Sequence, residues 1–346
     1  FFIINFIYSM VLISMVFTQN NVATTSAAFL EIGPGARSLG MGSAYVSVAD
    51  DPSALYWNPA GIANLLRPEV QSFYSPWLAE TQFYFNTAVL PMGAFGTLGL
   101  SFTAITMDEM LVRTVKDPEP SEYGQKFDAG NIAMGIAFAK KLTDRFSFGF
   151  QTKFIQETIW QMSSNGYAID IGTLFITKKN LRIGMSISNY GGKLAMEGVN
   201  TLVDIDVDEN IYGNNDRIDG SLSTAQWPLP LMFRFGVSRE FHFGNNKLLI
   251  AADAIHPNNN PEYINLGLEF SFLNMAFLRV GQSHTLYELK FQDSNSSVNI
   301  GPEQGLSFGA GLQYKIPRGP LLRIDYVYTE FGVFKNIEGY SFSLSF

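Results

Sequence analysis

Three histidines, His242, His256 and His284, are the side chains best suited to acid–base or metal chemistry, and each is isolated in the sequence. A zinc site needs several ligands at suitable spacing, and the chain has no cysteine that could supply a thiolate. Neither a Gly-x-Ser-x-Gly nucleophile turn nor a phosphate-binding loop is present. The sequence therefore predicts no enzyme, no catalytic residue, no cofactor and no metal site.

A group of acidic side chains in residues 202–219 is the second place where chemistry could occur, because clustered oxygen atoms bind Ca²⁺. The spacing of an EF-hand is absent, so we favour a solvated loop over a calcium site. The members of this acidic segment are Asp204, Asp206, Asp208, Glu209, Asp216 and Asp219.

The composition indicates a surface that tolerates apolar side chains. Hydrophobic residues make up 47% of the chain and aromatic residues 14%, whereas charged residues make up only 16%, against roughly 25% in an average soluble domain. The net charge of -8 argues against nucleic acid as a partner, since nucleic acid requires a basic surface.

Residues 1–17 form an uncharged apolar run, which the polar residues 18–21 follow. This pattern is typical of the hydrophobic core of a signal peptide, and we predict one over residues 1–19. Because neither an initiator methionine nor a basic region precedes the run, we expect the sequence to be cut short at its start. A single membrane-spanning helix is the alternative, although the run is marginal against the roughly 20 residues that a span needs.

From Pro68 onward, apolar and polar side chains alternate with the period of a β-strand. In residues 264–272, for example, isoleucine, leucine and phenylalanine alternate with asparagine, glycine, glutamate and serine. A membrane barrel needs this combination, with lipid outside and a polar lumen inside. It must also close, because an open sheet edge would leave backbone groups unpaired in hydrocarbon. The predicted fold class is all-β, a membrane-spanning antiparallel β-barrel of about 14 strands over residues 68–346.

The connections between the predicted strands alternate in length, as periplasmic turns and outer loops do. Short connections lie at residues 143–144, 178–180, 244–246, 274 and 317–319, and long ones at 108–127, 191–227 and 285–301.

Charged side chains fall on the predicted inner face of the strands, and both signs occur. A selective ion pore would show rings of one sign, so we favour charges that fill the lumen and pair with one another or with a plug. These lumen-facing residues are Lys153, Asp170, Arg182, Arg234, Asp253, Glu269, Arg279, Lys315, Arg323 and Asp325.

The last strand carries Tyr340, Phe342, Leu344 and Phe346 in alternation with serines, and the sequence ends on the aromatic residue. This pattern resembles the signal that the outer-membrane assembly machinery recognises. We therefore predict an integral protein of the bacterial outer membrane, in contact with outer-membrane lipid.

Residues 29–66 do not alternate and contain several glycines and prolines. Glycine permits positive φ and close backbone approach, and residues 50–53 could start a short helix with an aspartate cap. We expect a compact, irregular plug. Its motif residues, in order, are Gly35, Ala36, Arg37, Gly40, Met41, Gly42, Asp50, Asp51, Trp57, Asn58, Pro59, Ala60 and Gly61.

This ordered set resembles the N-terminal hatch of the FadL superfamily of outer-membrane β-barrels, and most closely the PorV/PorQ (UPF0164) family. Gly35 stands where a typical PorV has Asp, so the resemblance is to that branch in general. It implies a 14-stranded barrel whose hatch folds into the lumen, with Asn58, Pro59 and Ala60 in the hatch. The predicted organisation is then a signal peptide over 1–19, an N-terminal segment and hatch over 20–67 and the barrel over 68–346.

The resemblance implies two competing functions, of which we favour the first. A PorV/PorQ-like protein would act in type IX secretion or surface attachment, with secretion components and their cargo as partners. A FadL-like channel would pass hydrophobic small molecules, such as fatty acids or hydrocarbons, and would have an apolar pocket that runs from the outer loops to the hatch. An outer-membrane phospholipase would also be a barrel, but no motif favours its Ser–His pair.

Overall fold

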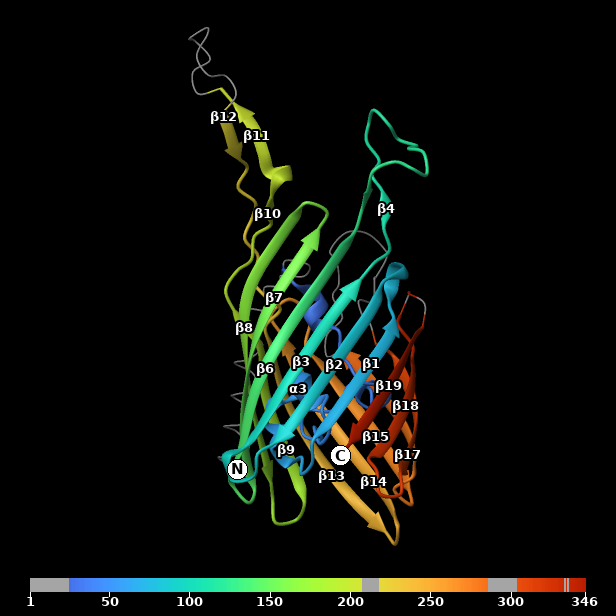
Figure 1. The fold of residues 1–346 in the computed structure, drawn as a ribbon. Helices are drawn as coiled ribbons and strands as arrows, with labels where there is room; N and C mark the ends of the chain where they lie inside the picture. Colours follow the sequence, from blue (N-terminus) through green and yellow to red (C-terminus); the bar gives the residue numbers. More distant parts are fainter. Residues whose placement is uncertain (1–24, 207–217, 286–303, 333, 335) are drawn as a thin grey trace, which may run out of the picture.

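The computed structural model describes residues 25–206, 218–285, 304–332, 334 and 336–346 (Figure 1). The predicted signal peptide, the first residues of the N-terminal segment and part of the acidic segment lie outside these residues. Within them, none of the helices is both long enough and apolar enough to cross a membrane.

Antiparallel strands form a closed barrel, and 14 strands of the described chain make its wall. The first and last strands close it, because Glu69 pairs with Ser345 and Tyr74 with Tyr340, and the amide of Phe346 donates to the carbonyl of Pro68 at 2.9 Å. The predicted fold class and strand number are confirmed. The wall strands are β1 (Glu69–Pro76), β2 (Gln82–Pro91), β3 (Thr97–Thr106), β6 (Ala129–Thr143), β7 (Phe146–Ile159), β8 (Met162–Ile176), β9 (Leu181–Gly191), β13 (Met232–Phe243), β14 (Asn246–Pro257), β15 (Tyr263–Phe272), β16 (Ala276–Thr285), β17 (Leu306–Lys315), β18 (Leu321–Thr329) and β19 (Ile337–Ser345).

The two ends of the barrel differ, as Figure 1 shows. One end carries only short turns, and the other carries long connections with small elements of their own, which rise above the wall. In outer-membrane barrels the short turns face the periplasm, so we call these ends periplasmic and extracellular. The smaller elements of the extracellular connections are η3 (Leu78–Glu80), β4 (Met110–Leu111), β5 (Lys126–Phe127), β10 (Glu197–Gly198), η5 (Val199–Thr201), β11 (Leu202–Ile205) and β12 (Ile218–Ser221), whereas η4 (Gly93–Phe95) lies in the short periplasmic turn between β2 and β3.

Alternation along each strand separates an outer apolar face from an inner face. On β15, Leu266 and Phe270 are exposed on the outside, whereas Asn265, Glu269 and Ser271 are buried in the lumen. A wall with apolar side chains outside and polar side chains inside is what a bilayer requires.

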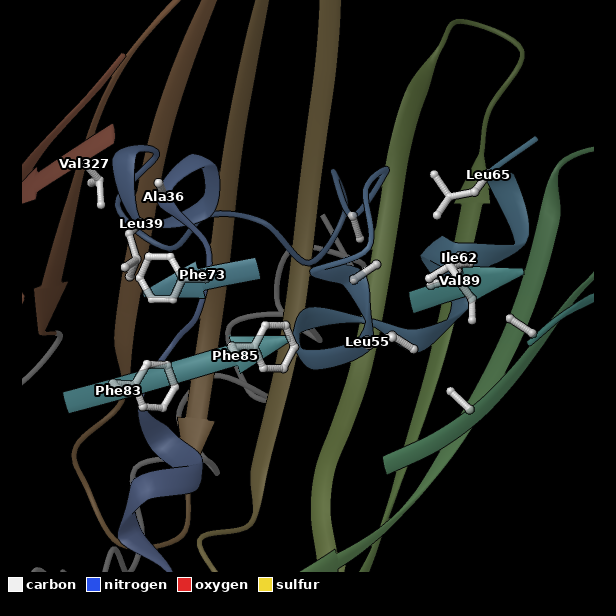
Figure 2. Packing of buried hydrophobic residues seen from close by; sticks show 14 residues of the cluster. Ala36, Leu39, Leu55, Ile62, Leu65, Phe73, Phe83, Phe85, Val89 and Val327 are labelled. Carbon is white, nitrogen blue, oxygen red and sulfur yellow. The ribbon is translucent and has the colours of Figure 1, made fainter. Parts of the chain in front are cut away.

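The inner faces of β1 and β2 depart from the predicted polar lumen. Phe73, Phe83 and Phe85 point inward and are buried. The hatch packs against them, and Figure 2 shows Leu39 of the hatch beside Phe73, and Ile62 beside Val89 of β2. Burial of this apolar area, at roughly 25 cal/mol per Å², holds one side of the hatch to the wall.

The hatch is a chain of short helical turns inside the barrel. The short helix that the sequence predicts over residues 53–56 is present one residue later, at Ala54–Trp57. Asp51 Oδ1 accepts hydrogen bonds from the amide of Ser53 at 2.9 Å and from its hydroxyl at 2.5 Å, which fixes the turn that starts this helix. The helical turns are η1 (Ala28–Glu31), α2 (Ala36–Gly40), α3 (Ala54–Trp57) and η2 (Pro59–Asn64).

A charge placed on the outer face should destabilise the barrel only where that face meets hydrocarbon. Leu266 on β15 and Leu222 beside β12 have nearly equal exposure, 55% and 58%. We expect Leu266→Arg to lower the free energy of unfolding in liposomes by roughly 2–4 kcal/mol, and Leu222→Arg to change it by less than about 0.5 kcal/mol. Urea titration of the two variants checks this, and equal losses would contradict the assignment of the wall to the bilayer.

Candidate functional site: the hatch and the cavity above it

Asn58 joins two hatch segments to the wall. Its amide nitrogen donates to the carbonyl of Val46 at 2.9 Å and to that of Thr173 on β8 at 3.0 Å, while its side-chain oxygen accepts from the amide of Ala60 at 3.2 Å. The residue is fully buried. An amide is the side chain that can donate and accept in this way at once, which accounts for an asparagine before Pro59.

Glycines in the wall make room for the hatch backbone at this point. A Cβ at Gly149 would lie 2.5 Å from the carbonyl carbon of Pro59, and one at Gly172 would lie 2.1 Å from Asn58 Oδ1. On the hatch itself, Gly42 has φ of +59°, and a Cβ there would lie 2.4 Å from the amide of Gln282. The wall and the hatch are therefore in direct backbone contact.

Arg37 binds the hatch to β15, a part of the wall different from the phenylalanine contacts on β1 and β2. Its Nε and Nη2 donate to the two carboxylate oxygens of Glu269 on β15, both at 2.8 Å. Its Nη1 donates to the hydroxyl of Tyr45 at 2.9 Å and to the carboxylate of Asp50. Because a guanidinium matches a carboxylate with two parallel hydrogen bonds, this contact fixes orientation as well as distance.

The wall continues this network away from the hatch. Arg279 Nε donates to Glu269 at 2.6 Å, Arg279 Nη1 lies 2.8 Å from Asp325, and Arg323 Nε donates to Asp325 at 2.9 Å. We call Arg37, Glu269, Arg279, Asp325 and Arg323 the Arg37–Glu269 network. It spans α2, β15, β16 and β18, and its charges alternate in sign.

Asp50 forms the second ionic contact between hatch and wall. Its carboxylate lies 3.3 Å from Arg182 Nη1 on β9, in addition to its pair with Arg37. Burial alone would raise the pKa of Asp50, but the guanidiniums of Arg37 and Arg182 hold it below its usual value. Asp50 therefore carries its charge across the neutral pH range.

The remaining lumen charges also have partners. Lys153 lies 2.9 Å from Asp170, and Asp253 Oδ2 accepts from the amides of Tyr45 at 2.6 Å and Val46 at 2.8 Å. Arg234 donates to Ser188 Oγ at 2.7 Å.

Lys315 differs from the other residues predicted to face the lumen. It follows the inward register, but it is exposed at the periplasmic turn, where its ammonium donates to the carbonyl of Gly319 at 2.8 Å. The strand ends at this residue. A side chain at this inward-facing position therefore lies outside the lumen.

The other motif residues lie within the hatch. Trp57 Nε1 donates to the carbonyl of Pro34 at 3.0 Å, and the amide of Ala36 donates to Ser341 Oγ on β19 at 2.8 Å. Asp51 accepts from the hydroxyl of Tyr45 at 2.6 Å, and Met41 is fully buried. The structure thus brings the predicted hatch motif and most of the predicted lumen charges together at one level of the barrel.

The histidines lie apart from this site. His242 and His256 are exposed and pair with Glu240 and Glu262, at 3.0 and 2.8 Å, and His284 is exposed on β16. Over the described ranges, no group of three or more potential metal ligands occurs.

A cavity of about 480 Å³ lies above the hatch, toward the extracellular end. Phe29, Ile32 and Leu39 of the hatch form its floor, and Trp77 and Ile105 are among the apolar residues of its sides. We call this cavity the vestibule. The resemblance to FadL-like channels implies an apolar pocket here, but none of its lining residues was predicted, because the lining comes from strand ends and loops where no periodic pattern marks the inner side.

No protein-family model and no curated protein sequence matches the chain. Solved structures match at low identity: the Pseudomonas putida toluene transporter TodX has a TM-score of 0.55 and 11% identity over 95% of this chain and 99% of its own. The Ralstonia pickettii toluene transporter TbuX gives 0.54 and 11% over 90% and 98%. A Pseudomonas aeruginosa FadL homologue gives 0.51 and 11% over 91% and 98%.

These structural similarities show the fold of the chain, which is that of FadL-like outer-membrane barrels. With the apolar outer wall, they place the chain in the bacterial outer membrane as an integral protein. The PorV/PorQ resemblance stays a prediction, because no family model supports it.

The Arg37–Glu269 network should be required for a closed lumen. Glu269→Gln leaves Arg37 and Arg279 with one carboxylate fewer, and we expect the free energy of unfolding to fall by about 3 kcal/mol and the ion conductance in planar bilayers to rise. Glu240→Gln, at the periplasmic rim, removes a carboxylate that lies 3.0 Å from His242 and 3.6 Å from Lys247. This control should cost less than about 1 kcal/mol and leave the conductance unchanged. Equal effects of the two variants would contradict the role of the network.

Proposed function

We propose that this protein is a channel for the passive passage of hydrophobic small molecules across the outer membrane. The observation that carries the proposal is the vestibule, a mainly apolar cavity near the extracellular end of the barrel whose floor is the hatch. Apolar pockets of this size bind small apolar ligands through burial of their surface. The two toluene transporters among the matching structures share this fold, which supports the same ligand class here.

Movement of the hatch is the second part of the proposal. Hatch side chains such as Leu55 and Met41 are fully buried, so the hatch fills the barrel below the vestibule. A ligand in the vestibule reaches the periplasm only when these segments shift. The hatch then acts as a gate between a binding site and the periplasmic end.

The binding part can be tested with bromobenzene, a heavy-atom quencher of monoaromatic size, because Trp77 lies beside the cavity. We expect saturable quenching of tryptophan fluorescence, most of which Trp77→Phe removes. Ile105→Asp places a carboxylate in the cavity wall and should weaken binding by about tenfold or more. Ile159→Asp, at an exposed strand end outside the cavity, should leave binding unchanged. Quenching without saturation, or equal losses in the two aspartate variants, would overturn a binding site in the vestibule.

The gating part can be tested by cross-linking, because the chain contains no native cysteine. The amide of Ala36 donates to Ser341 Oγ at 2.8 Å between hatch and wall, so an Ala36→Cys, Ser341→Cys variant brings two thiols close together, and oxidation is expected to join them. We expect the oxidised variant to bind bromobenzene but to stop its passage into proteoliposomes, and reduction to restore passage. Undiminished passage through the oxidised form would contradict a moving hatch.

The extracellular arm, formed by η5, β11 and β12, favours a second candidate function. Val199, Leu202, Ile205 and Ile218 are exposed on it, above the level of the wall (Figure 1). Apolar side chains at such a place suit contact with another protein, as in a PorV/PorQ-like component that receives type IX cargo. Affinity purification from outer membranes tests this: a secretion component bound to the wild type and lost from Val199→Asp, Leu202→Asp would favour docking over transport.

A further inference from the structure

The periplasmic rim carries basic side chains over consecutive strands of the wall. They lie at the ends of β6, β7, β8, β9 and β13, at the lower end of the barrel in Figure 1. All of them are exposed. We call this set the basic arc, and its members are Lys140, Lys141, Arg145, Lys178, Lys179 and Arg239.

The backbone pairing makes the arc continuous. The carbonyl of Arg145, in the β6–β7 turn, accepts a hydrogen bond of 2.8 Å from the amide of Ile176 at the end of β8. The β8–β9 turn follows with Lys178 and Lys179, and Arg239 on β13 pairs in register with Leu181, the first residue of β9. Neighbouring strands lie roughly 5 Å apart, so these cations follow one another along the rim.

Two members of the arc point outward, toward lipid. Lys140 pairs in register with Phe148, which is exposed on the outer face. The guanidinium of Arg239 lies 5.0 Å from the centre of the Phe241 ring on the same face of β13. Long basic side chains beside aromatic rings at a barrel end lie at the depth of lipid headgroups, because the stem stays in apolar surroundings while the charge reaches water.

The arc has few anionic neighbours in the described chain. None of its members forms an ion pair with a described acidic side chain, and Glu240 nearby pairs with Lys247 at 3.6 Å. Asp144, in the β6–β7 turn, is the acidic residue within the arc. The extracellular end is different, because the connection between β3 and β6 alone carries Asp108, Glu109, Asp117, Glu119, Glu122 and Asp128.

We propose that the basic arc binds the phosphate groups of anionic phospholipids in the periplasmic leaflet of the outer membrane. Guanidinium and ammonium groups both bind phosphate oxygens, the first with two parallel hydrogen bonds. Clustered Lys and Arg at a membrane surface attract anionic lipid, and the attraction falls off within a Debye length. The basic arc binds a row of headgroups along one side of the barrel. Anionic phospholipid is therefore the preferred neighbour of that side.

The test uses symmetric nanodiscs, in which both ends of the barrel meet the same lipids. Spin-labelled phosphatidylglycerol and phosphatidylcholine report the preference of the protein for anionic over zwitterionic lipid. The arc variant is Lys140→Gln, Arg145→Gln, Lys178→Gln, Lys179→Gln. The control variant makes the same change in charge at exposed extracellular positions, with Arg113→Gln, Lys116→Gln, Lys126→Gln and Lys193→Gln.

We expect the wild type to prefer phosphatidylglycerol by about threefold or more at low salt, and the arc variant to lose at least about half of that preference. The control variant should keep it, and 0.5 M salt should reduce it in the wild type, since the Debye length is then below roughly 5 Å. No preference in the wild type, or equal losses in the two variants, would overturn the proposal. So would a periplasmic protein that the wild type retains and the arc variant loses while the lipid preference stays the same in both.

Discussion

Hydrocarbon offers no hydrogen-bond partner to a backbone amide or carbonyl, and the rest of this structure follows from that constraint. Every wall strand must pair on both sides, so β1 closes onto β19 and the sheet has no edge in the bilayer. A closed wall of this many strands encloses more space than its own inward side chains fill. The chain fills that space with its hatch, and the inward faces of the strands must then match the hatch rather than water.

Different interactions hold the hatch to different parts of the wall. Toward β1 and β2 the contact is apolar, with Phe73, Phe83 and Phe85 against hatch aliphatic side chains. At β15 it is ionic, through Arg37 and Glu269. An apolar contact tolerates sliding, whereas a guanidinium held by two parallel hydrogen bonds does not. The ionic side therefore sets the register of the hatch, and the apolar side supplies burial.

The sequence was sufficient for the barrel and its closure, because both depend on local patterns, and for a compact, irregular N-terminal segment, whereas the place of that segment in the lumen came from the resemblance to the FadL superfamily. Strand alternation, short turns and the glycine-rich motif are all readable within a few residues. The inward phenylalanines of β1 and β2 were not predicted, because they face the hatch, whose position is a tertiary property. The sequence could not predict the pairing of Glu269 with Arg37 either, because Arg37 lies more than two hundred residues away in the chain. Lys315 shows the opposite error: its position follows the alternation of the strand, but it is the last residue of β17 and its side chain lies outside the lumen.

The charge distribution bears on whether so firmly bound a hatch can move. Departure of the hatch breaks the contacts of Arg37 with Glu269 and of Asp50 with Arg182, and a buried charge left alone costs several kcal/mol. Arg37 leaves together with Asp50, however, and the wall keeps Glu269 and Asp325 beside Arg279 and Arg323. Each part thus retains opposite charges within itself. Hatch movement therefore exchanges two ionic contacts for hydration. The wall residues that lose hatch partners are Arg182, whose side chain is 25% exposed and so open to water, and the buried Asp253, which loses the amides of Tyr45 and Val46. The electrostatic cost of opening such a gate falls on these two residues.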